Sequence, residues 1–341
     1  MARINFVKGM MPVILKKRKS SDFIQSMEVL LRRLPGTHSK KTLIENDLAK
    51  RKAGFRGEEA VDYFIKDSKE ITIVHDIRLS NGAEFFQIDT MLISSNFILI
   101  LEIKNISGTI YFDPTFNQLI QTRQENERGF LDPLIQAKRQ QRELIKWLHA
   151  VKISIPVEYL IVISNPSTVI KTASYHREAL NKVLHASHLI ERIERLKEKY
   201  PEETLSHKEI RKLSKTIVNK HIPANYNVLK YYDIHEKEII TGIPCPACSR
   251  LPMKRVRGTW KCVSCSTTDK KAHVRALQDY LHLISSSITN HQFREFTHLP
   301  SSNIAKKLLT GMELPCSGLF KDRTYHLSAD FFEKYNFTGQ K

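Results

Sequence analysis

The sequence predicts an α/β protein in which helices flank a mixed β-sheet, followed by a small metal-binding ribbon and a helical C-terminal segment. Apolar strand-like runs at Ile71–Leu79, Glu84–Ile93 and Phe97–Lys104 follow one helical segment and precede another. Two Cys-x-x-Cys pairs at 245–265 have the spacing of a metal site. A helical pattern returns after Lys270. Together these observations favour one sheet with helices on its faces and smaller modules behind it.

Each element of this fold has a local signal. Helical periodicity predicts helices over Ser21–Leu34 and Arg56–Lys66. Asp113-Pro114 marks a turn between two short strands. A helix over Asp132–His149 begins with Asp as N-cap and Pro at the first helical position. The apolar run Val157–Ser164 predicts a further buried strand, so the order is helix, three strands, helix, strand.

Changes in composition divide the chain into five parts. They are a basic helical N-terminal extension (1–50), an α/β domain (51–170), a helical or linker region (171–240), a ribbon (241–270) and a helical C-terminal segment (271–341). In the last part, Ser301 caps a helix and Gly318–Arg323 forms a wing-like turn. A small winged-helix module and a plain helical cap on the ribbon both fit this pattern.

The charge balance favours a polyanionic partner. Lys and Arg total 54 against 36 Asp and Glu, a formal net charge of +18. Nucleic acid is the first candidate and an anionic membrane surface the second. There is no apolar run of about 20 residues, so no membrane span is expected. Four of the five cysteines lie in Cys-x-x-Cys pairs, which indicates a reducing compartment and hence a cytoplasmic protein. Nothing in the sequence indicates the oligomeric state.

Two acids and a lysine form the most informative pattern. If Ser95 and Asn96 are the loop of a hairpin, Asp89 lies opposite Glu102, and Lys104 points to the same face. Two carboxylates side by side on apolar strands repel each other and lose solvation, which a divalent cation would relieve. Mg²⁺ is held by such carboxylates together with phosphates and water. The pattern therefore predicts metal-assisted phosphodiester hydrolysis, although a structural acid–lysine pair also fits.

Two further polar residues face the same region. Glu58 shares a helix face with Val61 and Ile65, so it points toward the sheet. It is either a further metal ligand or an acid favoured by the helix dipole. Gln136, in the first turn of the helix after Asp132, either orients a water or phosphate or is simply solvated.

Four motifs in order resemble the NERD (nuclease-related domain) family, a branch of the PD-(D/E)xK nuclease superfamily. The resemblance covers about residues 54–165 and rests on Gly57-Glu58, Gln87-Ile-Asp89, Glu102-Ile-Lys104-Asn105 and Asp132-Pro-Leu-Ile-Gln136. It differs from the common family pattern in having Asp132 where Asn is usual, a change that keeps an N-cap.

The resemblance implies an αβββαβ nuclease core that binds Mg²⁺ or Mn²⁺. It implies that Asp89 and Glu102 bind the metal together with the backbone carbonyl of Ile103. Lys104 becomes the catalytic lysine. Glu58 takes a second-site role, and Gln136 supports the site.

The cysteine pairs predict a second, structural metal site. Cys245, Cys248, Cys262 and Cys265 would hold Zn²⁺ with four thiolates, which leaves no position for a substrate. The residues between the pairs should form a short hairpin. It carries Trp260 among basic residues, which fits either a bound nucleic-acid strand or a solvated surface.

The sequence therefore predicts a metal-dependent nuclease acting on DNA, with the ribbon and basic C-terminal region binding nucleic acid. The alternative is a non-catalytic nucleic-acid-binding or adaptor protein that keeps a nuclease fold. A peripheral membrane protein ranks third, because the N-terminal helix lacks a cationic face along its length. DNA or RNA, strand form and cut polarity stay open.

Overall fold

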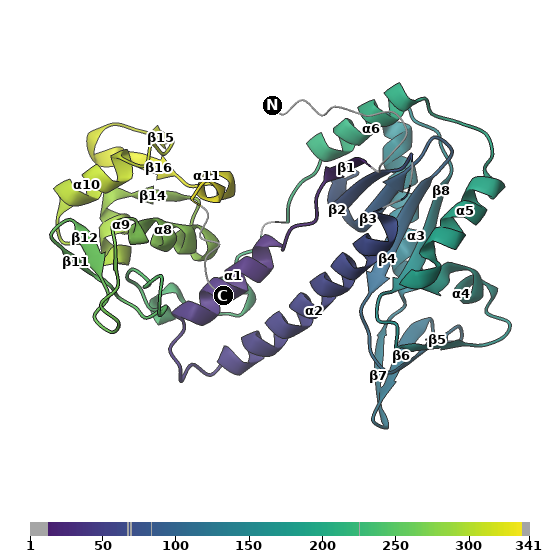
Figure 1. Ribbon diagram of the computed structural model, residues 1–341, viewed down its shortest axis with the longest axis horizontal. Coiled ribbons are helices and arrows are strands. Elements are labelled where there is room, and N and C mark those ends of the chain that lie inside the picture. Colours follow the sequence, from purple (N-terminus) through teal and green to yellow (C-terminus); the bar gives the residue numbers. More distant parts are fainter. Residues whose placement is uncertain (1–12, 67, 69, 83, 225, 336–341) are drawn as a thin grey trace. The chain divides into compact units, whose positions relative to one another are not determined.

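The computed structural model describes residues 13–66, 68, 70–82, 84–224 and 226–335. The chain divides into two compact units, one of residues 1–19 and 52–224 and one of residues 20–51 and 225–341 (Figure 1). Residues 1–50, which the sequence groups as one extension, are thus shared between the two units. None of the described helices has the length and apolar character that crossing a membrane requires.

A mixed six-stranded sheet forms the centre of the first unit, with the order β1-β2-β3-β4-β8-β10. The strands β2, β3 and β4 form an antiparallel meander, whereas β1 joins β2 and β8 joins β4 in parallel. The strand bounds are β1 Val13–Lys16, β2 Thr72–Ser80, β3 Phe85–Ile93, β4 Ile98–Lys104, β8 Val157–Ile163 and β10 Val183–His185. The predicted mixed sheet is confirmed.

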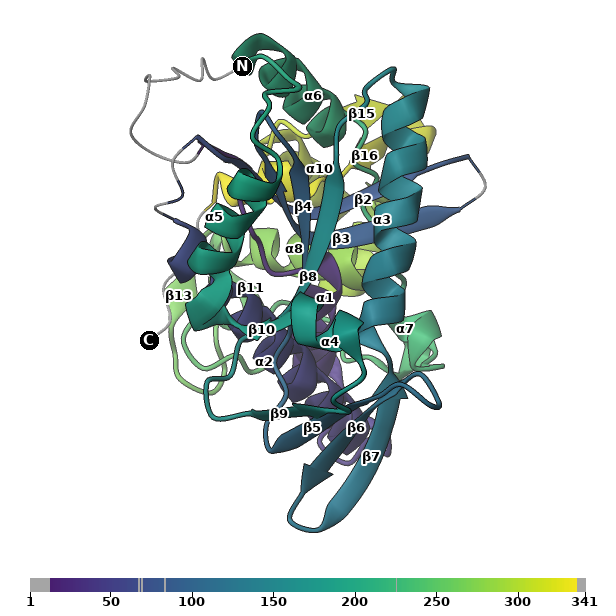
Figure 2. The ribbon, with the colours of Figure 1, turned by 90° about the vertical axis from the view of Figure 1, so that its right-hand side faces the viewer.

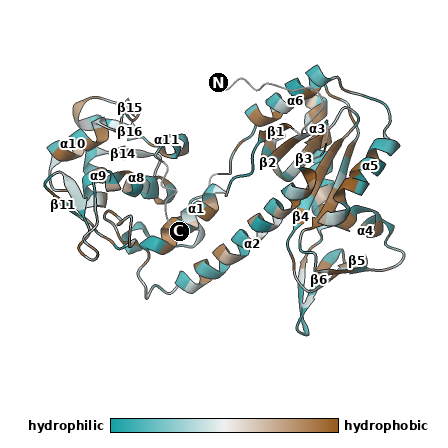
Figure 3. Cartoon of the chain, viewed as in Figure 1, coloured by the Kyte–Doolittle hydropathy of each residue, from teal (hydrophilic) through white to brown (hydrophobic). Residues whose placement is uncertain are grey.

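Helices cover both faces of this sheet (Figure 2). The helices α2 (Lys41–Ile65) and α5 (Leu189–Lys199) pack on the face that carries Leu99 and Leu101. The helices α3 (Pro133–Ala150) and α6 (His207–Asn219) pack on the opposite face. Because both faces are covered, β4 is apolar at nearly every position, and Figure 3 shows the sheet strands as hydrophobic ribbons.

The hairpin between β3 and β4 has the register that the sequence predicts. Ile93 pairs with Ile98 and Thr90 pairs with Leu101. The Ser94 hydroxyl closes the turn, since it accepts a hydrogen bond from the backbone N–H of Phe97 at 3.1 Å. The next position of this register places Asp89 opposite Glu102.

The two flanking helices differ in how well the sequence predicts them. Asp132 caps α3 by accepting a hydrogen bond from Leu134 N at 2.8 Å, and Pro133 is the first helical residue, as predicted. In contrast, α2 begins at Lys41 rather than near Arg56. Its hydrophobic stripe is weak before that point, so periodicity alone did not predict the additional turns.

A second, four-stranded sheet of order β7-β6-β5-β9 belongs to the same unit. Its strands are β5 Thr109–Asp113, β6 Gln118–Arg123, β7 Asn126–Leu131 and β9 Val169–Thr172. The first two are the short strands that flank Asp113-Pro114. Ile110, Phe112 and Leu119 attach this small sheet to the core on the α3 face of the main sheet. The short helix α4 (Arg177–Lys182) and a 3-10 turn at Ala186–His188 follow β9.

The second unit combines the ribbon with helices from both ends of the chain. Its helices are α1 Asp22–Arg33, α7 Val228–Tyr231, α8 Ala272–Leu283, α9 Asn290–Thr297, α10 Ser302–Thr310 and α11 Ala329–Glu333, with 3-10 turns at Glu236–Glu238 and Phe320–Asp322. Its strands are β11 Lys254–Val256, β12 Thr259–Lys261, β13 Thr268–Asp269, β14 Ser287–Thr289, β15 Cys316–Ser317 and β16 Thr324–His326.

A buried ion pair joins the N-terminal and C-terminal helices of this unit. Arg33, at the end of α1, contacts Asp279 of α8 at 2.8 Å, and both side chains are almost fully buried. The Arg33 guanidinium also donates to the carbonyl oxygen of Ile240 at 2.8 Å. Both buried charges, on Arg33 and Asp279, are therefore paired, as buried ions require.

Candidate active site

The candidate active site lies where β3 and β4 leave their shared ladder. Asp89 belongs to β3, and Glu102 and Lys104 belong to β4. The hairpin register brings the two acids opposite each other, and the period of two along a strand puts Lys104 on the face of Glu102. The structure thus brings together the three residues on which the sequence prediction depends.

The electrostatics of Asp89 mark a site that lacks positive charge. Burial, together with the negative charges of Glu102 and Glu58, raises the pKa of Asp89 well above its usual range. The backbone N–H of Ile103 donates a hydrogen bond to Asp89 Oδ2 at 3.1 Å. This hydrogen bond and the charge of Lys104 both lower the pKa of Asp89 and so oppose the effect of burial. A divalent cation between the acids would supply the missing charge.

Two groups hold Glu102 in place. Its side chain is 1 % exposed, and Lys104 Nζ lies 2.6 Å from its Oε1. Gln140 Nε2 donates to its Oε2 at 2.7 Å. Gln140 was not predicted from the sequence, although it lies one helical turn beyond Gln136 and therefore on the same face of α3. Gln140 Oε1 is buried and has no hydrogen-bond partner among the described residues.

Gln136 contacts Lys104. Its Oε1 accepts a hydrogen bond from Lys104 Nζ at 3.2 Å. Lys104 therefore bridges Glu102 on β4 and Gln136 on α3. This contact orients the lysine along the edge of the site.

Glu58 lies on α2, close enough for its charge to act on Asp89. Burial, reinforced by Asp76 and Asp62, raises the pKa of Glu58 to about 7, although Arg18 lowers it. Arg18 Nη1 lies 2.5 Å from Glu58 Oε2.

Arg18 is a site residue that the sequence patterns do not predict. Its side chain is 3 % exposed and lies 2.9 Å from Asp62 and 3.7 Å from Asp76. It also donates to the hydroxyl of Thr90 at 2.7 Å, directly beside Asp89 in the chain. The run of basic residues around Arg18 gave only a general signal of positive charge, because nothing local indicates that β1 pairs with β2.

Gly57 explains how α2 approaches the site so closely. A Cβ atom at this position would lie 2.5 Å from Asn105 Cβ and 2.6 Å from Ser164 Oγ. Asn105 follows Lys104 directly, and its amide donates to the carbonyl oxygen of Ala53 at 2.6 Å. The glycine therefore allows contact between α2 and the carboxyl end of β4.

The donor set fits a hard divalent cation at Asp89 and Glu102. Both are oxygen ligands, and they are adjacent. Among the residues that the structure describes, Lys104 is the cation that contacts Glu102 and lowers the pKa of Asp89. Among the described residues, the four cysteines form the cluster of potential ligands whose donor atoms all lie within 4.8 Å of one another. Glu58, paired with Arg18, is therefore not drawn into a compact three-acid cluster with Asp89 and Glu102.

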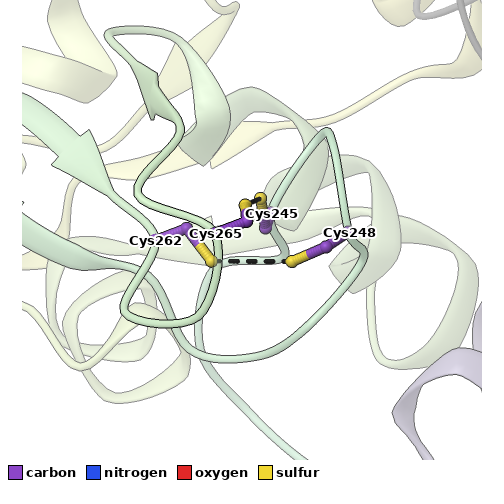
Figure 4. A group of neighbouring side chains, drawn as sticks. All are labelled: Cys245, Cys248, Cys262 and Cys265. Carbon is purple, nitrogen blue, oxygen red and sulfur yellow. Dashed lines mark hydrogen bonds between the residues drawn. The ribbon is translucent and has the colours of Figure 1, made fainter.

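The four cysteines of the second unit lie close enough together to bind one metal ion, since their sulfur atoms are all within 4.8 Å of one another (Figure 4). Cys245 Sγ lies 3.5 Å from Cys265 Sγ, and Cys248 Sγ lies 3.6 Å from Cys262 Sγ. Zinc bound to four sulfurs at about 2.3 Å needs sulfur–sulfur separations of roughly 3.8 Å. The predicted cluster is confirmed, and it fits structural zinc.

The same backbone turn builds both cysteine pairs. Cys245 O accepts from Ser249 N at 2.9 Å, and Cys262 O accepts from Ser266 N at 3.1 Å. Both serines have positive φ angles, 57° and 59°. Backbone N–H groups of Cys265 and Ser264 lower the pKa of Cys262, although burial opposes them, which favours the thiolate.

The predicted hairpin between the cysteine pairs is present as β11 and β12, but Trp260 does not face solvent. Its side chain is 1 % exposed, and Arg255 lies over the ring at 4.9 Å. The buried ring is unavailable for stacking on a nucleotide base. Trp260 therefore acts as a core residue of the ribbon.

Residues 53–164 match the family model of the nuclease-related domain, NERD. This match spans α2 from Ala53 onward, the β2–β4 meander, α3 and β8, and so contains all five residues of the predicted site. No curated protein and no solved structure gives a significant match to the chain.

Proposed function

We propose that this chain, which carries a nuclease-related domain at residues 53–164, is a metal-dependent nuclease that hydrolyses DNA phosphodiester bonds. The observation that supports this most strongly is the juxtaposition of Asp89 and Glu102 beside Lys104, where burial and the charge of Glu102 raise the pKa of Asp89. The chain order α2, β2, β3, β4, α3, β8, with β5, β6 and β7 inserted between β4 and α3, also agrees with the αβββαβ core of PD-(D/E)xK nucleases.

Each site residue has a role in the proposed hydrolysis. Asp89 and Glu102, with the carbonyl of Ile103, would hold Mg²⁺ or Mn²⁺. The bound metal supplies Lewis-acid polarisation of the phosphate and an activated water. Water oxygen bonds to phosphorus as the bond to the leaving nucleotide oxygen breaks.

The other polar residues act on charge and orientation. Lys104 donates to the phosphate oxygen on which negative charge develops, or helps to deprotonate the water, and Gln136 holds the lysine in place. Gln140 fixes Glu102 by its hydrogen bond. Glu58 adds negative charge to the site and is a candidate second-site acid when released from Arg18.

The second unit supplies a candidate DNA-binding module. The order α8, β14, α9, α10, β15, β16, with a sheet of order β14-β16-β15, agrees with a winged-helix module. In this assignment α10 is the helix that enters a DNA groove, and it exposes Ser302, Asn303, Lys306 and Lys307. Phe320, in the wing-like turn, is 93 % exposed.

A cleavage assay separates a nuclease from a non-catalytic binding protein. Linear, circular and single-stranded DNA would each be incubated with Mg²⁺ or Mn²⁺ and the wild-type protein, Lys104→Ala or Lys212→Ala. Lys212 is an exposed lysine on α6 with no assigned role. We expect Lys104→Ala to cut about 100- to 1,000-fold more slowly, with binding retained and Lys212→Ala unchanged. If all three proteins bind DNA in a salt-sensitive way and none cuts it, the result would favour a non-catalytic nucleic-acid-binding protein.

A further inference from the structure

A cavity of about 750 Å³ lies in the first unit, between the small sheet and the edge of the main sheet. Its lining comes from β5 and β9 on one side and from α4, β10 and α5 on the other. The volume is in the range of ligand-binding pockets. None of the five residues assigned to the candidate active site lines it.

One wall of the cavity carries an aromatic ring beside a cation. Tyr111 of β5 and Lys171 of β9 are direct partners in a parallel pair, so their side chains leave the same face of the sheet. Tyr111 is half-buried and Lys171 is exposed. Such a pair suits an unpaired nucleotide, because the ring stacks on the base and the cation contacts the phosphate.

The opposite wall adds positive charge. Arg192 and Arg195 of α5 line the cavity, together with the acid Glu191. Arg195 contacts Glu191 at 2.6 Å, but both side chains are more than half exposed, so the pair is weak and can exchange for another anion. The two walls together favour an anionic ligand.

His185 links the cavity to the candidate active site. It pairs with Ile163 on β8, and Ile163 pairs with Lys104 on β4, so the three residues form one row across the sheet. Two strand spacings separate Lys104 from His185, which is about 10 Å. About three stacked nucleotides cover this distance at 3.4 Å each. His185 Nδ1 is buried and has no hydrogen-bond partner among the described residues.

We infer that this cavity binds a single-stranded segment of the nucleic acid next to the bond that is cut. A base stacks on Tyr111, and the adjoining phosphates contact Lys171 and the α5 arginines. A concave pocket of this size admits one or two unpaired nucleotides and excludes a duplex. The inference rests on the proposed function for the identity of the ligand, and it adds strand form and a binding subsite to it.

The test is site-specific crosslinking of the full chain to a short single-stranded oligonucleotide that contains 5-iodouracil. The buffer would lack Mg²⁺, Mn²⁺ and chelators, so that no cleavage is required and the cysteine site is left intact. Peptide mapping should place the crosslink on Tyr111. Lys171→Ala should lower the yield of the crosslink at Tyr111 at least about fivefold, which corresponds to about 1 kcal/mol.

The chain offers a matched control pair outside the cavity. Tyr63 and Lys66 on α2 are likewise a neighbouring tyrosine and lysine, with Lys66 Nζ 3.8 Å from the centre of the ring, and both are exposed. Lys66→Ala should leave the crosslink at Tyr111 unchanged, and Tyr63 should carry none. A crosslink absent from Tyr111, or unchanged in Lys171→Ala, would overturn the subsite.

The two proposals can fail separately. If the wild type cuts DNA but Tyr111 does not crosslink, the subsite is wrong and the nuclease assignment stands. If Tyr111 crosslinks as expected but no DNA is cut, the subsite stands and the protein binds single strands without hydrolysing them.

Discussion

Arg18 and Lys104 are two cations near the site, and they neutralise different groups of carboxylates. Arg18 is shared among Glu58, Asp62 and Asp76, which it contacts at 2.5, 2.9 and 3.7 Å. Within the described part of the chain, Asp89 and Glu102 have Lys104 as their cationic neighbour. The need for a further cation is therefore greatest at Asp89 and Glu102, which is where the metal is proposed.

Glu58 gives a pH-dependent test of this charge distribution. Its pKa is about 7 in the folded protein against 4.5 normally, chiefly because of burial. Since the folded pKa is raised, the stability that protonated Glu58 contributes is complete below pH 4.5 and is lost as the pH rises through 7. In urea unfolding of the metal-free protein between pH 4.5 and pH 7, the free energy of unfolding of the wild type should fall by up to about 3 kcal/mol relative to that of Glu58→Gln. A difference that is constant with pH, or of opposite sign, would contradict the raised pKa.

At the scale of single elements, the contact of α2 with β4 depends on one glycine. Gly57→Ala would place its Cβ 2.5 Å from Asn105 Cβ, so α2 or β4 must move. We expect a loss of about 1 to 3 kcal/mol in unfolding free energy, together with reduced cleavage.

Gly54 provides the matched control on the same helix. A Cβ there meets no atom within 4 Å, so Gly54→Ala should stabilise α2 by about 0.5 to 1 kcal/mol. Equal effects of the two substitutions in thermal unfolding would show that Gly57 is not required for the close approach.

The ribbon should depend on its metal. Trp147 and Trp260 are the two tryptophans of the chain, so Trp147→Phe leaves Trp260 as the single reporter. Removal of zinc with a chelator should expose Trp260 and shift its fluorescence to longer wavelength, because the four thiolates then lose their common ligand. Cys262→Ser should show the shift before chelation. Unchanged emission after complete zinc removal would mean that the ribbon is held by packing alone.

Local patterns predicted the elements whose partners are close in the chain. The β3–β4 register followed from a short turn at Ser95 and Asn96, and the start of α3 followed from Asp132 and Pro133. The cysteine cluster followed from spacing alone. In each case a few neighbouring residues determine the geometry.

Elements that depend on distant partners were not predictable in this way. Strand β1 has only four residues and gains its place by pairing with β2, far along the chain. Arg18 therefore could not be assigned to the site from the sequence. Strands β9 and β10 are similarly short, so the cavity between them could not be predicted from local sequence patterns.

At the scale of the whole molecule, the net charge of +18 should make DNA binding strongly salt-dependent. If α10 contacts phosphates through Lys306 and Lys307, replacing both with Ala should lower the slope of log binding constant against log salt by about 2. Lys212→Ala with Lys215→Ala on α6 is the matched control. An equal slope for the wild type and the α10 variant would exclude α10 from the DNA interface.

The most direct test of the central claim is the initial rate of DNA cleavage as a function of Mg²⁺ concentration, measured for wild type and Asp89→Asn. Asp89→Asn keeps the shape of the side chain and its bond from Ile103 N but removes one charge of the metal site. We expect a saturable Mg²⁺ dependence in wild type and a rate at least about 100-fold lower in the variant. Equal rates in the two proteins, or no Mg²⁺-dependent cleavage of any DNA form by wild type, would contradict a metal-dependent nuclease at Asp89 and Glu102.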